Sequence, residues 1–239
     1  MTAAAQVETP ITWFHSHAFP DGERTAGIKP AHMLAQEADA IFAHGVVGKS
    51  VLDIGSWDGY FAFEAEKRGA ARVLATDHFC WSGPGWGTKA GFDYAHAKYD
   101  SKVETLDIDV PDISPETVGM FDVVLFLGVL YHVKDPLAAL ARAASVAREM
   151  IVVETASALD ILPWPVLRFY RSRELNDDPT NFWAPNRAGL SAMLTDVGFG
   201  RSAIRPSPWV RTSWRKPYIQ WMANRVIAHG WRDGSPSRH

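Results

Sequence analysis

The sequence predicts an α/β fold, in which a parallel sheet has helices on both faces and is closed by a C-terminal antiparallel hairpin. Three observations support this. Apolar strands alternate with helical stretches, two of these strands end in an acidic residue (Asp53 and Asp77), and the last two strand candidates have no helix between them. Consecutive strands without a crossover pair as a hairpin. With 239 residues, 47% of them apolar, the chain fits one domain with a full-sized core.

The first helix is expected over 31–46, where apolar residues recur at helical spacing and Pro30 suits the helix start. Strands that are apolar on both faces follow, as in a parallel sheet buried on both sides. They are predicted at about 50–55, 72–77, 103–108, 121–128 and 149–156. Further helices are predicted at 136–147 and 185–197, and the final hairpin strands at 199–206 and 218–226.

Two segments are expected to lie outside this alternation. Residues 1–30 are predicted to form an N-terminal arm or lid, and residues 31–239 the main domain. Within that domain, 157–184 is too long for an ordinary connection. It is therefore predicted to be a lid-like insertion that covers or shapes a site.

The composition excludes several classes of protein. The longest apolar stretches are interrupted too early to span a bilayer, and the N-terminus lacks a basic segment followed by an apolar core. The single cysteine, Cys80, permits no internal disulfide and no Cys-based zinc site, and is expected to be a small core residue. We therefore expect a cytoplasmic protein without a membrane partner and without a metal site.

A glycine turn after the first strand indicates the ligand. Gly55 and Gly59 enclose Trp57 and Asp58, where dinucleotide sites usually carry a third glycine that lets the backbone approach a pyrophosphate. A bulky indole and a carboxylate argue against a phosphate and favour a cationic, phosphate-free adenosine such as S-adenosylmethionine. Asp77, which ends the second strand, is expected to accept hydrogen bonds from both ribose hydroxyls. The alternative is that the glycines serve only a tight turn.

A longer pattern resembles a known family. The string Gly-Val-Leu-Tyr-His ends the run 121–132, and Asp-Pro-Leu at 135–137, Phe-Trp-Ala-Pro-Asn at 182–186 and Gly-Phe at 198–199 follow it. From about 49 to 199 the chain resembles the bacterial tRNA wobble-uridine carboxymethyltransferases and their small relatives. These are class I S-adenosylmethionine-dependent methyltransferases. The resemblance implies a Rossmann-like fold and S-adenosylmethionine, or its carboxylated variant, as the cofactor.

The resemblance also implies a set of cofactor-binding residues. Gly55 matches the glycine at the methionine part of the cofactor, and Lys29 corresponds to a lysine that approaches the cofactor carboxylate. Asp77 and His78 match the ribose-binding strand end. The full expected set is Lys29, Asp53, Gly55, Ser56, Asp77, His78, Ile108, Asp109, Leu127 and Tyr131.

Two loops complete this expected site. Ile108 is expected to cover the purine face, while Asp109 or Asp107 accepts a hydrogen bond from the exocyclic amine. Leu127 and Tyr131 match positions by the methionine and the sulfonium, at the carboxyl end of the fourth strand, where a parallel sheet places its ligands.

The chain also departs from this family. The carboxymethyl-transferring enzymes read the extra carboxylate with a lysine of the N-terminal arm, the loop tyrosine and an arginine near the last strand. Here the tyrosine is Tyr131, and Arg215 or Lys216 stands in for the arginine, but the arm has no lysine before Lys29. We therefore expect ordinary S-adenosylmethionine rather than the carboxylated cofactor.

His132, next to Tyr131, is the expected general base, because an imidazole with a pKa near ~6.5 accepts a proton at neutral pH. The alternative is that His132 only makes hydrogen bonds that hold its loop. His15 and His17 share a face if they lie on a strand, but with no third ligand a lid contact is expected rather than a metal site. The expected catalytic residues are His132 and Tyr131, and the expected substrate contacts are His15, His17, Arg171, Trp183, Arg211 and Arg215.

Three functions are compatible with these residues. The first is methyl transfer to a hydroxyl or amine of a small-molecule acceptor. The second is tRNA modification, which the resemblance suggests and a basic tail favours: residues 201–239 hold eight Lys or Arg against Asp233 alone, interleaved with aromatics, in a chain of net charge −3. The third is a non-catalytic cofactor-binding protein. The alternative interpretation of this tail is a pair of strands whose charged side chains face water.

Overall fold

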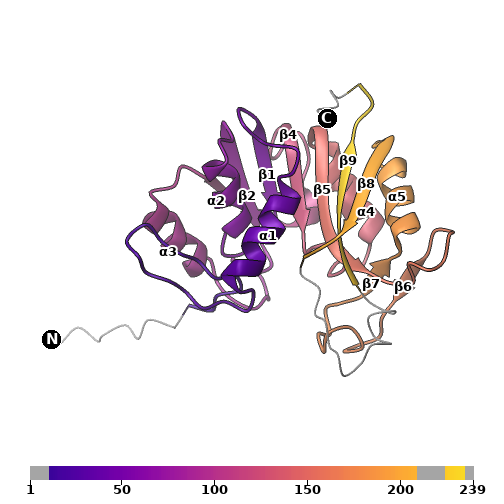
Figure 1. Ribbon diagram of the computed structural model, residues 1–239, viewed down its shortest axis with the longest axis horizontal. Coiled ribbons are helices and arrows are strands. Elements are labelled where there is room, and N and C mark those ends of the chain that lie inside the picture. The colour runs from indigo at the N-terminus through magenta and orange to yellow at the C-terminus, as the bar shows by residue number, and fades with distance from the viewer. Residues whose placement is uncertain (1–10, 209–223, 235–239) are drawn as a thin grey trace.

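The computed structural model describes residues 11–208 and 224–234. Within them, seven strands form one sheet in the order β3-β2-β1-β4-β5-β9-β8, and Figure 1 shows this sheet across the molecule. Strands β1 to β5 pair in parallel, whereas β9 is antiparallel to both β5 and β8. The predicted parallel sheet with a closing hairpin is confirmed. The strands are β1 (Ser50–Ile54), β2 (Arg72–Asp77), β3 (Glu104–Asp107), β4 (Phe121–Leu127), β5 (Ala147–Ser157), β8 (Arg201–Pro206) and β9 (Asn224–Trp231).

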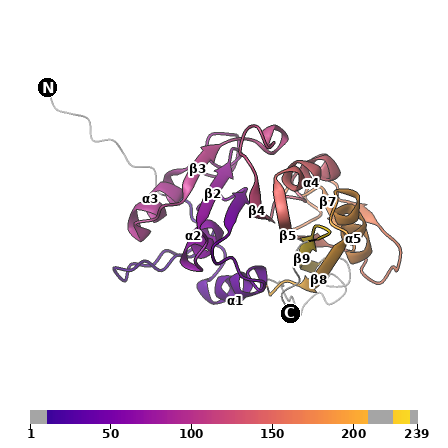
Figure 2. The ribbon, with the colours of Figure 1, turned by 90° about the horizontal axis from the view of Figure 1, so that it is seen from above.

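Helices cover both faces of this sheet (Figure 2). Because successive strand residues point to opposite faces, Val51 joins the core under α1, α2 and α3, while its neighbour Leu52 joins the core under α4 and α5. The described helices are α1 (Ala31–Ile41), α2 (Tyr60–Lys67), α3 (Ala90–Tyr99), α4 (Pro136–Ser145) and α5 (Arg187–Asp196), with a 3₁₀ turn at Val110–Asp112. None of them has the length and apolar character needed to cross a bilayer.

Three local predictions were wrong in their bounds or burial. Helix α1 ends at Ile41 rather than near 46, and Gly45 at φ 72° lies in the turn that follows. Strand β3 is exposed at every residue rather than apolar on both faces, because it is an edge strand. The last strand is β9 at 224–231 rather than 218–226, of which 218–223 lies outside the described residues. Strand β9 lies between β5 and β8, and this interior position explains why the apolar run Val226–Ala228 is buried.

Two segments flank the carboxyl ends of the strands. A second, small sheet of β6 (Leu167–Phe169) and β7 (Trp183–Pro185), which pair antiparallel, lies within residues 157–185. The amide of Phe182 donates to the carbonyl of Tyr131, which ties this segment to the loop after β4. On the other side, residues 11–30 double back on themselves, with bridges between His15 and Lys29 and between Ala18 and Arg24.

Candidate active site

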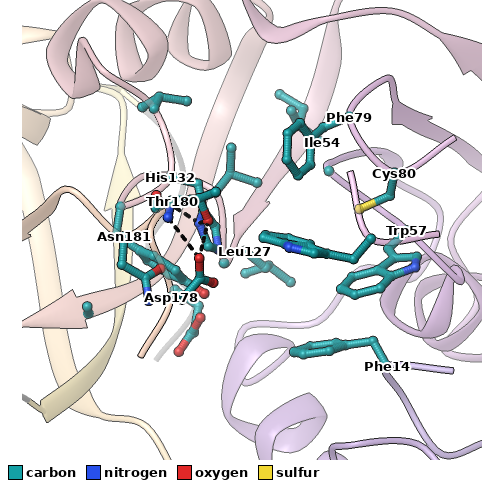
Figure 3. Close-up of a pocket in the computed structure, with 18 of the residues that line it drawn as sticks. Phe14, Ile54, Trp57, Phe79, Cys80, Leu127, His132, Asp178, Thr180 and Asn181 are labelled. Atoms are coloured by element: carbon teal, nitrogen blue, oxygen red, sulfur yellow. Dashed lines mark hydrogen bonds between the residues drawn. The ribbon is translucent and has the colours of Figure 1, made fainter. Parts of the chain in front are cut away.

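One large cavity opens at the carboxyl ends of β1, β2 and β4, between the segments 11–30 and 157–184. Its volume is about 1660 Å³. A pocket for one small ligand usually measures about 300–1,000 Å³. This cavity therefore has room for a cofactor and an acceptor side by side, and Figure 3 shows the side chains of the two walls.

The glycine turn after β1 forms the floor of the cavity. Gly55 has φ 77°, and a Cβ built on it would lie 2.4 Å from Cγ2 of Val129, on the loop after β4. Only glycine therefore lets these two loops approach so closely. Asp53 is fully buried and accepts a hydrogen bond from the hydroxyl of Ser56 at 2.8 Å. Burial raises the pKa of Asp53 to about 6.

Asp77 ends β2 with both carboxylate oxygens anchored. One oxygen accepts from the amide of Cys80 and the other from the amide of Trp57, each at 2.9 Å. A carboxylate has about four lone-pair sites, so two amide donors leave capacity for two ribose hydroxyls. Burial raises the pKa of Asp77, and the nearby thiol of Cys80 is buried with a pKa raised to about 12. Cys80 is buried, as expected, but it packs at the wall of the cavity rather than within a core cluster.

At the next strand end, the two candidate aspartates differ in position. Asp109 and Ile108 line the cavity, whereas Asp107 forms an ion pair with His78 at 2.8 Å outside it. Asp109 also accepts from the amide of Val110, which fixes its side chain at the start of the 3₁₀ turn. Ile108 and Asp109 thus add an aliphatic side chain and a carboxylate to the cavity wall. The ring of His78 also reaches the cavity wall, but its Nδ1 is held by Asp107.

At the other end of the cavity, charged groups lie in matched pairs. The ammonium of Lys29 donates to both oxygens of Glu37, at 2.7 and 3.0 Å, and both side chains are buried. The guanidinium of Arg225, on β9, bonds both oxygens of Glu154, on β5, and donates at 3.0 Å to the hydroxyl of Tyr131. Leu127, at the end of β4, also lines this part of the cavity.

His132 lines the cavity with one ring nitrogen engaged. Its Nδ1 lies 3.1 Å from the carbonyl and 2.9 Å from the hydroxyl of Thr180, and that hydroxyl donates to Asp178 at 2.6 Å (Figure 3). A carbonyl can only accept, so Nδ1 carries the proton and Nε2 keeps its lone pair. Nothing in 11–208 or 224–234 bonds to Nε2, and Nε2 is not fully buried. Burial lowers the pKa of His132 to about 4, so the ring stays neutral at pH 7.

An aromatic wall crosses the cavity opposite the segment 157–184. Phe14 stacks on Trp57 with ring centroids 4.8 Å apart, Trp57 lies 5.5 Å from Trp86, and Trp86 lies 5.2 Å from the ring of His132. Trp57 has φ 47°, a left-handed conformation that is uncommon for a bulky residue. Its indole lines the cavity at the position where a pyrophosphate site needs an open backbone.

One interpretation of the glycine turn is corrected here. Asp58 does not face the cavity as a partner for a cationic cofactor. It is buried and accepts from the amides of Phe14 and His15 at 2.8 Å each, and it also bonds Nδ1 of His15. Although burial acts to raise the pKa of Asp58, His15 holds it well below its usual range. Asp58 therefore fastens the N-terminal segment to the domain, a contact between residues more than 40 positions apart.

The predicted substrate residues are only partly brought together. His15 lines the cavity, whereas His17 is buried against Phe19 away from it, and no cluster of metal-ligating side chains occurs in the described ranges. Arg171 is exposed and Trp183 donates to the carbonyl of Lys134, so neither lines the cavity. Arg211 and Arg215 lie outside the described residues, as does Lys216.

A family described as "Methyltransferase domain" matches residues 29–200. The chain belongs to this family. The tRNA U34 carboxymethyltransferases of Helicobacter acinonychis and Dichelobacter nodosus are 27% and 39% identical to it over 159 and 114 residues. These matches cover 64% and 46% of this chain, and 56% and 33% of those enzymes, so the chain spans at most about half the length of the curated relatives it matches.

Solved structures show the same fold. The N-terminal domain of EvdMO1, crystallised with S-adenosylhomocysteine (SAH) and D-fucose, aligns with a TM-score of 0.64 at 22% identity, over 92% of this chain and 91% of that one. Magnesium protoporphyrin IX methyltransferase (ChlM) from Synechocystis PCC 6803, with bound S-adenosylmethionine, aligns with a TM-score of 0.56 at 16% identity, over 84% and 80%. The chain therefore has a methyltransferase domain with the class I, Rossmann-like fold that the sequence predicted.

Proposed function

We propose that the protein transfers a methyl group from S-adenosylmethionine to a hydroxyl or amine of a small-molecule acceptor. The observation that carries this proposal is the unprotonated Nε2 of His132, which faces a cavity large enough for both ligands. The cofactor supplies an electrophilic methyl group on a sulfonium. The protein's own residues supply position, exclusion of water and a proton acceptor.

On the cofactor side, the contacts already described support a role for each residue. Asp77 accepts from the ribose hydroxyls, and Ile108 with Asp109 holds the adenine. Gly55 gives space for the methionine part beside Asp53 and Ser56, while the Lys29 ammonium lies nearby to meet the cofactor carboxylate. Leu127 and Tyr131 flank the sulfonium.

On the acceptor side, His132 acts as the general base. The Thr180 carbonyl and hydroxyl orient its ring, and Asp178 orients the hydroxyl in turn. Since the pKa of His132 is lowered to about 4, the ring takes the acceptor proton in step with methyl transfer rather than before it. Residues 11–30 and 157–184 serve as arm and insertion that enclose the acceptor, with His15 on the arm side.

The same geometry favours the ordinary cofactor over the carboxylated one. Arg225 is the described arginine that contacts Tyr131, but Glu154 already matches its charge by accepting from both Nε and Nη2. A carboxylated cofactor would bring a second negative charge next to Glu154. Like charges in a buried site are strongly unfavourable, so this pair leaves no cation for an added carboxylate.

tRNA is the second candidate substrate, because the relatives that the chain matches act on tRNA by their names. If tRNA is the substrate, the protein is expected to shift the electrophoretic mobility of tRNA. This binding should weaken as the salt concentration rises and be lost in the double variant Arg211→Ala/Arg215→Ala. Absence of binding at low salt excludes it. The neighbour crystallised with SAH and D-fucose instead favours a small acceptor.

Two variants of His132 test the base. Calorimetry first measures S-adenosylmethionine binding, and no binding by the pure protein would refute the whole proposal. Turnover is then followed with a labelled methyl group on a panel of hydroxylated and aminated compounds. His132→Ala and His132→Asn are expected to lower turnover by roughly 10²–10⁴ while cofactor affinity stays unchanged. Wild-type activity is expected to fall in acid near pH 4, where the ring protonates, rather than near 6.5. Near-wild-type turnover in His132→Asn would contradict the assignment.

A further inference from the structure

The insertion places an arginine on the wall of the cavity. Along β6 the side chains alternate, so that Leu167 and Phe169 are exposed outside the cavity whereas Arg168 lines it. The guanidinium of Arg168 lies over the ring of Tyr170, 4.4 Å from its centroid, and Tyr170 is buried and lines the same cavity. Stacking on an aromatic face favours a fixed position for a guanidinium. Arg168 is therefore held at the cavity rather than extended into solvent.

The charge of Arg168 is not matched by a carboxylate in the part of the chain that the structure describes. Two arginines that follow it along the chain, Arg173 and Arg187, do pair with carboxylates, those of Asp177 and Asp160. A guanidinium carries five N–H donors in a planar fork and stays charged at pH 7. Because Arg168 is half-buried rather than enclosed, the cavity wall presents an unmatched positive charge.

The two acidic side chains that the insertion adds to the cavity are engaged elsewhere. Asp178 accepts from the amide and the hydroxyl of Thr180, at 2.8 and 2.6 Å. Glu174 is exposed and accepts from the amide of Arg171 at 3.0 Å. Neither forms an ion pair with Arg168. Since the carboxylates have donors and the guanidinium has no carboxylate, the group that this wall lacks is an anion.

Arg168 lies on the same wall as His132. The amide of Tyr170 donates to the carbonyl of Phe182, and the amide of Phe182 donates to the carbonyl of Tyr131, which precedes His132. Segments joined by such bonds lie about 4.8 Å apart, so the backbones of Tyr170 and Tyr131 are on the order of 10 Å apart. A ring that bears its reacting group and an acidic group at opposite ends spans a distance of this order.

We propose that the acceptor is an organic anion, whose hydroxyl or amine meets Nε2 of His132 and whose carboxylate or phosphate meets the guanidinium of Arg168. This deepens the proposed function and rests on it. Arg168 is then a specificity-determining residue, since the planar fork matches a carboxylate or phosphate with two parallel hydrogen bonds. As the bond from the acceptor atom to the methyl group forms and the sulfur–methyl bond breaks, the proton of the reacting group passes to Nε2. The products are the methylated acceptor, the neutral thioether SAH, and an imidazolium that returns its proton to solvent.

The opposite wall suits a ring between these two ends. Figure 3 shows Phe14 and Trp57 across from His132 and Asp178. Trp86 is 41% exposed and lies 5.2 Å from the ring of His132. An aromatic surface packs on the face of any flat molecule and does not itself select an anion. The test therefore uses flat probes that differ in charge.

Titration followed by saturation-transfer NMR, on the full chain loaded with SAH, tests the charge directly. Each pair of probes differs in charge but hardly in shape: 4-hydroxybenzoate against 4-hydroxybenzamide, and 4-hydroxycinnamate against 4-hydroxycinnamide. 4-Hydroxyphenyl phosphate is the phosphate arm. We expect each acid to bind roughly 10-fold or more tightly than its amide. The tighter of the carboxylate and phosphate arms identifies the source of the anion. Equal affinity within both pairs, or no binding of any of the three anions, overturns the proposal.

Three substitutions assign the preference to a residue. Arg168→Met removes the charge and keeps an apolar stem, and it is expected to abolish the preference for the acids. Arg171→Met is the matched control, because Arg171 is exposed in the same segment and does not line the cavity. Lys134→Met tests another cation that lines the cavity. A preference that survives in Arg168→Met, or that is lost equally in Arg171→Met, overturns the proposal.

SAH affinity, measured by calorimetry, separates a lost contact from a lost fold. It is expected to be unchanged in all three variants, so failure of the anion class is distinguishable from failure of cofactor binding, which would refute the proposed function itself. If Arg168→Met loses SAH binding, Arg168→Lys decides the matter. It keeps the charge without the planar fork, and part of the preference for the acids is expected to remain. Loss of the whole preference in this variant, with SAH affinity intact, overturns the proposal.

Discussion

The pair of Arg225 and Glu154 gives the sharpest prediction about stability. Their side chains are 15% and 2% exposed, and the guanidinium bonds both carboxylate oxygens as well as Tyr131. Arg225→Met would leave the Glu154 charge buried between strands without a partner. Breaking a buried pair by removing one member costs about 3–5 kcal/mol. Because Arg225 opens toward the cavity, we expect a loss of ~3 kcal/mol in the free energy of unfolding.

The control is an exposed pair on the same sheet. Arg72 and Glu104 are 43% and 51% exposed, and such pairs contribute about 0–1 kcal/mol. Urea denaturation at pH 7 is expected to show a small loss for Arg72→Met and a large one for Arg225→Met, with much of it recovered in Arg225→Met/Glu154→Leu. Equal losses in the two single variants would refute the reasoning.

The pH dependence has a definite sign. Although burial acts to raise it, Arg225 lowers the pKa of Glu154. The pair therefore stabilises the protein fully above the unfolded-state value of about 4.3, and that stability is lost as pH falls through the lower folded-state pKa. In Arg225→Met the burial alone remains and raises the pKa of Glu154. The loss of unfolding free energy in the variant is thus expected to become smaller as acid neutralises the unpaired carboxylate of Glu154. Urea denaturation at a series of pH values measures this change.

Two further predictions concern the cofactor side. Asp77→Ala is expected to weaken SAH binding by about 1.5–3 kcal/mol for each charge-assisted hydrogen bond lost, and a dissociation constant unchanged by calorimetry would contradict its role at the ribose. Asp53 has a pKa raised to about 6 against an ordinary value near 3.9, so the wild type loses stability as pH rises between these values. Asp53→Asn has no carboxylate to ionise, so its melting temperature is expected to rise relative to that of the wild type as pH increases across this interval. A difference in melting temperature that does not change with pH would contradict the raised pKa of Asp53.

The sequence predicts the sheet well because its signals are local. The acidic residues Asp53 and Asp77 mark the carboxyl ends of their strands, and Asp135 with Pro136 marks a helix start. These signals depend only on neighbours within a few positions. Asp58 was misinterpreted because its partners lie on the distant N-terminal segment. Glu154 directly follows the apolar run 150–153, and a carboxylate at that position of a buried strand is a sequence signal for a buried ion pair.

Other parts of the site depend on tertiary contacts that no spacing encodes. Arg225 contacts Tyr131 only because β9 enters the sheet beside β5, which a charge pattern in the tail cannot specify. Thr180 and Asn181 come to the cavity because the insertion is tied to the loop after β4. His132 could be selected from the sequence, but the burial that shifts its pKa away from the ordinary value could not.

The position of β9 has a consequence for synthesis. It is the last strand along the described chain, yet it lies inside the sheet, between β5 and β8. A nascent chain that has produced β5 and β8 but not β9 leaves the ladder of β5 unpaired, and unpaired strand edges attract other chains. The guanidinium of Arg225 arrives with the same strand. The pairing of β9 therefore completes the cavity and covers the aggregation-prone edge in a single step, late in synthesis of the described chain.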